Sequence, residues 1–356
     1  MKFLATTRIT HLPDPITGKV TSTTDRLREV VDSAVRAEEL GFDGFGVEER
    51  HDRPFISSSP PVVLSHIAAR TSAIRLFTAI TALSLLDPVR VCEDYSTLDH
   101  LSGGRLELII GEGSGTAPAK LSRVRAEDQP DRSREAYELF RRLWHGDAQT
   151  WPRPLQQPIR IWHGSATSAE SADLAARWGD PLFAANVTTP VETYAELVRY
   201  YRERWEFYGR DPGAILIGAG TAGYYSAPTS QQAIQTYRPI YNARQVRLRG
   251  LGLKPAFCSL EDAIERGSIL VGSPQQITDK VRRCHERLGH EVMHLHADAD
   301  GLTETQHRRS QELFFDKIAP VLRREIPSRP FPQAPASLVP APSVPVSPVR
   351  TPLVPV

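Results

Sequence analysis

A run of polar residues, Glu48-Glu49-Arg50-His51-Asp52, follows a short apolar stretch that ends at Val47. His51 could give or take a proton near neutral pH, and Arg50 could hold an anionic or electron-rich group. A solvated loop explains five consecutive polar residues equally well. The run therefore offers Arg50 and His51 as candidate catalytic residues if their side chains point into a site.

Three hydroxyl residues, Ser165, Thr167 and Ser168, stand before a predicted helix. Hydroxyls and free backbone amides at a helix N-terminus suit a phosphate group. The pattern from Thr167 to Glu170 is also a capping box, which needs no ligand. Gly272-Ser273 before Pro274 is a competing phosphate site, and helix capping explains it too.

Two histidines, His294 and His296, lie two residues apart in a predicted strand, with Asp298 and Asp300 after them. Residues i and i+2 of a strand face the same side, so both imidazoles could bind one metal ion. Barrels of the amidohydrolase kind carry such a pair on the first strand, whereas this strand is the last. Structural histidines are therefore the favoured interpretation, and a metal-dependent hydrolase remains the rival hypothesis.

Small residues follow the third and fourth predicted strands. Gly111, Gly113 and Gly115 alternate after residues 106–110, and residues 78–84 carry no titratable group. Glycine at the end of a buried strand lets backbone approach a flat or anionic group closely. Ordinary turns and barrel packing explain the same residues.

Eight strand-like runs alternate with helix-like runs, which predicts a parallel sheet with helical crossovers. Eight such units favour a single (β/α)8 TIM barrel, with an open doubly wound sheet as the alternative. The predicted strands are residues 3–7, 42–47, 75–81, 106–110, 159–163, 181–185, 215–225 and 292–296. Residues 230–267 are predicted as a helix through Tyr241 followed by an irregular insert.

Composition and charge argue against a nucleic-acid-binding, membrane-associated or secreted protein. A formal net charge of +1 over 356 residues gives no reason to expect nucleic acid or a membrane surface as partner. Three scattered cysteines and no visible signal peptide favour a cytoplasmic protein. From Ile326 onward proline recurs among serine, alanine and valine, so residues 326–356 are predicted to form a disordered proline-rich tail after a domain of residues 1–325.

Five motifs in this order resemble the bacterial luciferase-like, flavin-dependent monooxygenases. They are Gly41-Phe-Asp-Gly-Phe-Gly-Val-Glu-Glu-Arg-His51, Asp87-Pro-Val-Arg90, Leu98-Asp-His-Leu-Ser-Gly-Gly-Arg105, Gly111-x-Gly113-Ser-Gly115 and Val271-Gly-Ser-Pro274. The resemblance covers residues 3 to about 323 and implies a TIM barrel with flavin at the carboxyl ends of its strands. The cofactor-binding residues that it implies are Ala79, Ile80, Gly111, Gly164, Ser165, Thr167 and Ser168.

Two positions depart from the family pattern. Arg50 stands where many members have a histidine implicated in catalysis, and Glu112 stands where an arginine often helps to hold the phosphate. A carboxylate beside a phosphate is repulsive, so Glu112 is expected to point away from it. These departures also leave open a non-catalytic flavin-binding relative.

The resemblance implies an FMN-dependent monooxygenase that oxidises a small organic substrate with O2. The flavin would act as reduced FMN (FMNH2), reduced by NAD(P)H directly or by a separate flavin reductase, with a deazaflavin as a variant. A homodimer without bound metal is expected from the family. The protein would supply a dry apolar pocket around the flavin, and the flavin would carry the chemistry.

Overall fold

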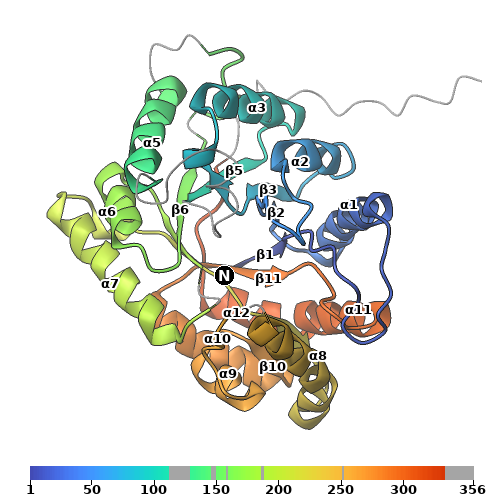
Figure 1. The fold of residues 1–356 in the computed structure, drawn as a ribbon. Helices are drawn as coiled ribbons and strands as arrows, with labels where there is room; N and C mark the ends of the chain where they lie inside the picture. Colours follow the sequence, from blue (N-terminus) through green and yellow to red (C-terminus); the bar gives the residue numbers. More distant parts are fainter. Residues whose placement is uncertain (112–128, 146–149, 158, 186–187, 251, 333–356) are drawn as a thin grey trace, which may run out of the picture.

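Short parallel strands close into a barrel, and helices surround it (Figure 1). The computed structural model describes the chain except for residues 112–128, 146–149, 158, 186–187, 251 and 333–356. In the described part, eight strands form the barrel: β1 Lys2–Thr7, β2 Gly44–Val47, β3 Arg75–Thr78, β5 Leu106–Gly111, β6 Ile161–Ser165, β7 Leu182–Ala184, β8 Ile217–Ala219 and β11 Val292–His296. The first and last strands, β1 and β11, pair with each other, and pairing of β3 with β5 closes the ring, which confirms the predicted (β/α)8 fold.

Amphipathic helices cover the strands from outside because each buries one apolar face on the barrel. They are α1 Thr23–Leu40, α2 Pro60–Ala68, α3 Pro88–Leu101, α5 Gln129–His145, α6 Ala169–Trp178, α7 Val191–Phe207, α8 Ser230–Gly250, α9 Leu260–Arg266, α10 Pro274–Leu288, α11 Glu304–Leu313 and α12 Ala319–Glu325. Local signals set several ends. Asp87 caps α3 by accepting from the amide of Val89, and Gly41 ends α1 with a φ of 93°.

Large apolar side chains fill the barrel interior at mid-height. Leu4, Phe77, Ile109, Trp162 and Phe183 are among the buried side chains that form the inner core. Because side chains alternate along a strand, the next inward residue of each strand lies one layer closer to the carboxyl end. That layer forms the site described below.

The amino-terminal end of the barrel is closed by the segment that follows α12. Phe331 packs on Phe77 with ring centroids 5.7 Å apart, and the Arg75 guanidinium lies 5.7 Å from the Phe331 ring. Arg329 donates a hydrogen bond to Glu291 at 2.9 Å. Residues 326–332, which the sequence analysis assigned to the tail, therefore pack on the barrel, and the rest of the tail lies outside the described residues.

The predictions for residues 215–267 were partly wrong. The predicted strand 215–225 is two strands, β8 in the barrel and β9 Tyr224–Ser226, which pairs with β10 Leu270–Gly272 in a separate sheet. The expected irregular insert contains the continuation of α8 to Gly250 and the short helix α9. The helices that the structure describes include none long and apolar enough to cross a bilayer.

Candidate active site at the carboxyl end of the barrel

Four glycines line the inner wall where the strands end. They are Gly46 of β2, Gly111 of β5, Gly164 of β6 and Gly220 just after β8. A Cβ on Gly46 would lie 3.3 Å from the Cβ of Ala79, and a Cβ on Gly220 would lie 2.6 Å from Nε2 of His294. Half of the barrel strands thus contribute backbone instead of side chain to this layer, and the side chains of Ala79, Ile80 and His294 pack onto these glycines. We call this layer the glycine cradle.

Ile80 lies across the cradle between two of these glycines. A Cβ on Gly111 would come within 2.8 Å of Cδ1 of Ile80, and one on Gly164 within 2.7 Å of Cγ2 of Ile80. Ala79 precedes it and continues β3 through a 3.0 Å hydrogen bond from its amide to the carbonyl of Val47. Ala79, Ile80, Gly111 and Gly164 are therefore brought together, with Ile80 as an apolar surface at the floor.

The loop between β6 and α6 holds the predicted phosphate hydroxyls. Oγ of Ser165 donates to the carbonyl of Ser168 at 3.2 Å, and Oγ of Ser168 accepts from the amide of Ser171 at 3.2 Å. Ser168 is thus the N-cap of α6, and the capping box predicted on Thr167 is wrong because the helix starts one residue later. Thr167 is exposed, and the first backbone amides of α6 are left for a ligand.

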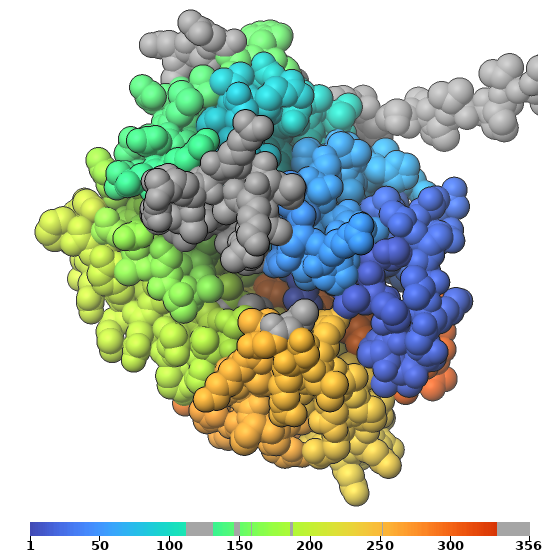
Figure 2. All heavy atoms as spheres, in the orientation of Figure 1, coloured from blue at the N-terminus to red at the C-terminus, as the bar shows by residue number. Residues whose placement is uncertain are grey.

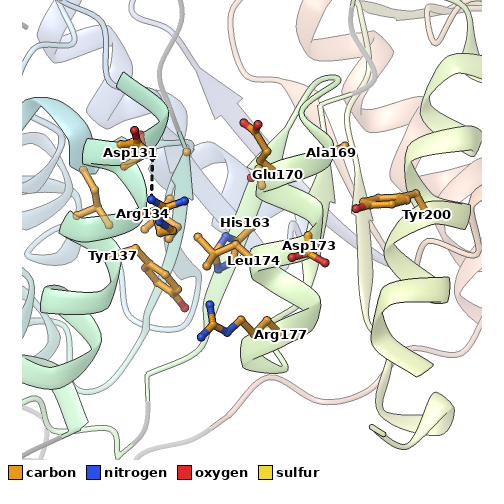
Figure 3. A pocket seen from close by; sticks show the side chains of 15 residues that line it. Asp131, Arg134, Tyr137, His163, Ala169, Glu170, Asp173, Leu174, Arg177 and Tyr200 are labelled. Atoms are coloured by element: carbon orange, nitrogen blue, oxygen red, sulfur yellow. Dashed lines mark hydrogen bonds and ion pairs between the residues drawn. The ribbon is translucent and has the colours of Figure 1, made fainter. Parts of the chain in front are cut away.

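A cavity of about 360 Å³ runs from the end of β5 to the first turn of α6 (Figure 3). Gly111 and Ile110 lie at one side of it, Arg134 comes from α5, and Ala169 and Glu170 come from α6. Arg134 pairs with Asp131 at 2.8 Å and is largely exposed. The N-terminal turn of α6 and Arg134 would favour a phosphate group in this cavity, whereas Asp131, Glu170 and Asp173, which also line it, would oppose one.

A buried polar network forms the deep wall of that cavity. Asp180 accepts from Nη1 of Arg141 at 2.9 Å, lies 3.1 Å from Nε2 of His163, and is hydrogen-bonded by Tyr137. Burial alone would raise the pKa of Asp180, but the hydrogen bond and charge of His163 and the charge of Arg141 lower it. The network fixes α5 against β6 and so holds the walls of the cavity in place.

The two predicted catalytic residues occupy different surroundings. Arg50 is held by Asp52 through two hydrogen bonds of 2.9 and 2.8 Å, and its guanidinium lies 4.3 Å from the centre of the Phe55 ring. Nε2 of His51 lies 2.7 Å from a carboxylate oxygen of Glu49. This hydrogen bond raises the pKa of His51, although partial burial opposes the shift. His51 is thus oriented by a buried partner, whereas Arg50 is bound within its own loop.

Two charged residues that continue the inner face of the barrel were not among the predicted site residues, although Glu48 begins the polar run that supplied Arg50 and His51. Glu48 follows Gly44 and Gly46 at alternate positions, and its amide donates to the carbonyl of Thr7 at 2.9 Å. Arg8 follows Leu4 and Thr6 in the same way. Burial raises the pKa of Glu48, while the charge of Arg8 acts against that shift. The period-two alternation of strand residues could have identified both.

The His294 and His296 pair does not form a metal centre. The two rings are stacked with centroids 6.0 Å apart, and each Nδ1 has its own partner: Thr6 at 3.0 Å and Asp300 at 2.7 Å, respectively. Burial lowers the pKa of His294 to about 3. The part of the chain that the structure describes contains no group of three or more histidine, cysteine or acidic residues arranged for a metal ion. The metal-dependent hydrolase is therefore not favoured.

The sequence profile of the luciferase-like monooxygenases matches residues 1–291. The chain belongs to this family. Glu112, the departure expected near a phosphate, lies outside the described residues.

Among curated relatives, an uncharacterized protein of Mycobacterium tuberculosis is 30% identical over 174 residues, which is 45% of this chain and 60% of the relative. The chain thus spans about three fifths of that relative's length. Limonene 1,2-monooxygenase of Rhodococcus erythropolis is 25% identical over 307 residues, covering 79% of this chain and 78% of the relative. Among solved structures, the oxygenating constituent of the Pseudomonas putida 3,6-diketocamphane monooxygenase, in complex with FMN, superposes with a TM-score of 0.72 at 18% identity, over 90% of this chain and 98% of that one.

Proposed function

We propose that this protein is a monooxygenase that uses reduced FMN and O2 to oxidise a small organic substrate. The observation that carries the proposal is the cavity of about 360 Å³ between Gly111 at the end of β5 and the first turn of α6, in a chain of the luciferase-like family. In barrels of this kind ligands bind at that end of the strands. We also propose that electrons reach the flavin from NAD(P)H directly or from a separate flavin reductase. The same proposal includes a homodimeric state.

The residues that would hold FMN fall into two groups. Ala79, Ile80, Gly111 and Gly164 would contact the ring, since they form an apolar surface with little side-chain bulk. The first amides of α6 would hold the phosphate, with Ser165, Thr167 and Ser168 nearby and Arg134 across the cavity. When bound, the reduced flavin supplies the electrons with which O2 is activated.

The protein's own residues would exclude water, orient the substrate and move a proton. An apolar layer lies below the cradle and Phe331 packs on it from the amino-terminal end, which would favour exclusion of water. His51 is the candidate for proton transfer, because Glu49 fixes the ring through Nε2. Arg50 would serve to position the loop after β2.

Titration of the full chain with FMN, reduced FMN and a deazaflavin tests the proposal. We expect FMN to bind in the oxidised or reduced form, and substrate to stimulate O2 consumption when a flavin reductase and NADH are supplied. Preferential binding of the deazaflavin would assign a deazaflavin as the cofactor in place of FMN. Tight flavin binding without any O2 consumption would favour a non-catalytic role, and failure to bind any flavin would refute the proposal.

A further inference from the structure

One histidine at the barrel mouth, His296, is held by a carboxylate. His296 is the last residue of β11, and its Nδ1 lies 2.7 Å from a carboxylate oxygen of Asp300. The chain turns back at Asp300, whose φ of 52° lies in the left-handed region that an aspartate adopts at some cost. A carboxylate on one ring nitrogen fixes the tautomer and leaves the other nitrogen as the proton acceptor.

The second ring nitrogen of His296, Nε2, is accessible. Among the residues that the structure describes, no hydrogen bond to Nε2 is formed, and the atom is not shielded from solvent. The His296 side chain keeps 14% of its surface exposed. A histidine that is fixed through one nitrogen and open at the other has the arrangement of a general base.

The position of His296 in β11 places it one layer above the glycine cradle. Val292 belongs to the inner core, and alternation along the strand puts His294 and then His296 on the same inward face. A Cβ on Gly220 of the cradle would lie 2.6 Å from Nε2 of His294. The ring of His296 stacks over His294 with centroids 6.0 Å apart. His296 therefore faces the space above the cradle, where a substrate would lie.

The charges around this histidine are balanced. Burial lowers the pKa of Arg8 at the end of β1, but the charges of three carboxylates outweigh burial and raise it. These carboxylates belong to Glu48, Asp298 and Asp300. Because the cation at this end of the barrel already faces negative charge, the mouth favours a neutral molecule over an ion.

Asp300 stays ionised beside the imidazole. Burial acts to raise the pKa of Asp300, but the hydrogen bond and charge of His296 and the charges of two arginines, Arg8 and Arg244, lower it. An ionised carboxylate stabilises the imidazolium that forms when His296 takes up a proton. The other titratable groups that act on the pair are Glu48 after β2, Tyr237 of α8 and His307 of α11.

A cavity of about 860 Å³ leads to this pair from outside, and Ala297 and Asp300 line it. It is bounded by α1, α8 and α11, three helices from distant parts of the chain (Figure 1). Figure 2 shows the α1 segment in blue next to the α8 and α9 segment in yellow to orange on this face. Tyr237 and Ile240 give the cavity an aromatic and aliphatic wall. Its size suits a small organic molecule.

We propose that His296 is a catalytic base that accepts the proton of a substrate hydroxyl at Nε2, with Asp300 as its positioning residue. The substrate is a neutral molecule with a hydroxyl on an unsaturated carbon, as in a phenol, because such a hydroxyl is acidic enough to give its proton to an imidazole. In this step the O–H bond breaks, its electron pair stays on the oxygen, and an N–H bond forms at Nε2. The inference rests on the proposed function, which supplies O2 as the oxidant.

NMR titration of the full chain with phenol and anisole, observed at the ring nitrogens of His296, tests the proposal. We expect phenol to bind about threefold to tenfold more tightly than anisole, as for one added hydrogen bond, and to shift the Nε2 signal. His296→Phe keeps a flat ring over His294 and should bind both compounds equally. Asp300→Asn should change the tautomer of His296 and reduce the preference for phenol. The matched control is His100→Phe, an exposed histidine of α3 that should leave the preference unchanged.

Undetectable binding of phenol, equal binding of phenol and anisole, or an Nε2 signal that does not move would overturn the inference. The same holds for a folded His296→Phe variant that still prefers phenol. Circular dichroism checks the fold, and Asp300→Asn decides the matter if His296→Phe does not fold. FMN titration of the same proteins separates the two proposals. A preference for phenol without FMN binding would refute the proposed function and leave the hydroxyl site, whereas FMN binding without that preference would refute only the role of His296.

Discussion

Replacing Glu49 with glutamine would test how the barrel mouth holds His51. Glu49 is 6% exposed and lies 2.7 Å from Nε2 of His51, and its second oxygen accepts from the amide of Ala82 at 3.1 Å. Glutamine keeps the shape and an oxygen for the amide of Ala82, but it removes the negative charge. The variant therefore isolates the charge-assisted part of the contact with His51.

The expected loss of stability follows from the negative charge of Glu49 and from the exposed fraction of the His51 side chain. A hydrogen bond to a charged group contributes about 1.5–3 kcal/mol, and the quarter of the His51 side chain left exposed reduces this to about 1–2 kcal/mol. Because the hydrogen bond of Glu49 raises the pKa of His51 above its unfolded value, the stabilisation is fully present below about pH 6.5. It is lost as the pH rises through the folded-state pKa.

Urea unfolding at pH 5 and pH 9 measures the unfolding free energy, and NMR titration of the imidazole measures the pKa of His51. We expect Glu49→Gln to lose about 1–2 kcal/mol of unfolding free energy at pH 5 and much less at pH 9, and to lower the pKa of His51. Glu203→Gln, an exposed carboxylate of α7, is the control and should change neither. Equal losses at both pH values, or an unchanged midpoint for His51, would refute the reasoning. If His51 transfers a proton, the pH profile of kcat should move with that midpoint.

Three further outcomes are expected. Gly164→Val should weaken FMN binding at least tenfold in a fluorescence titration, because even a Cβ at position 164 would lie 2.7 Å from Ile80. Gly250→Ala has open space around it and should leave FMN binding unchanged in the same titration. Arg75→Met should lower the unfolding free energy by about 1–3 kcal/mol, because it removes a cation 3.3 Å from the buried carboxyl of Glu107 and leaves only Arg160, at 4.0 Å. Arg90→Met should cost under about 1 kcal/mol in urea unfolding. Dialysis against EDTA should leave O2 consumption intact, and a loss restored by a divalent metal ion would contradict the expected metal-free site.

The helices and strands could be predicted from the chemistry of neighbouring residues in the sequence. Proline and glycine mark the ends of α3 and α1, and the strand predicted at residues 292–296 has the limits of β11. Prediction was weaker where local signals compete. Ser168 took the capping role expected of Thr167, since adjacent hydroxyls differ little in capping preference and the start of the helix decides between them.

The sequence by itself determined the family, the eightfold alternation of strand and helix, and the small residues that leave backbone exposed at the strand ends. Only the tertiary structure decided which side chains meet. It brought Ile80 onto Gly111 and Gly164 and joined Thr6 to His294. The physical reason is range: periodicity and capping act over a few residues, whereas closure of the barrel joins β1 to β11, whose contacts no local pattern encodes.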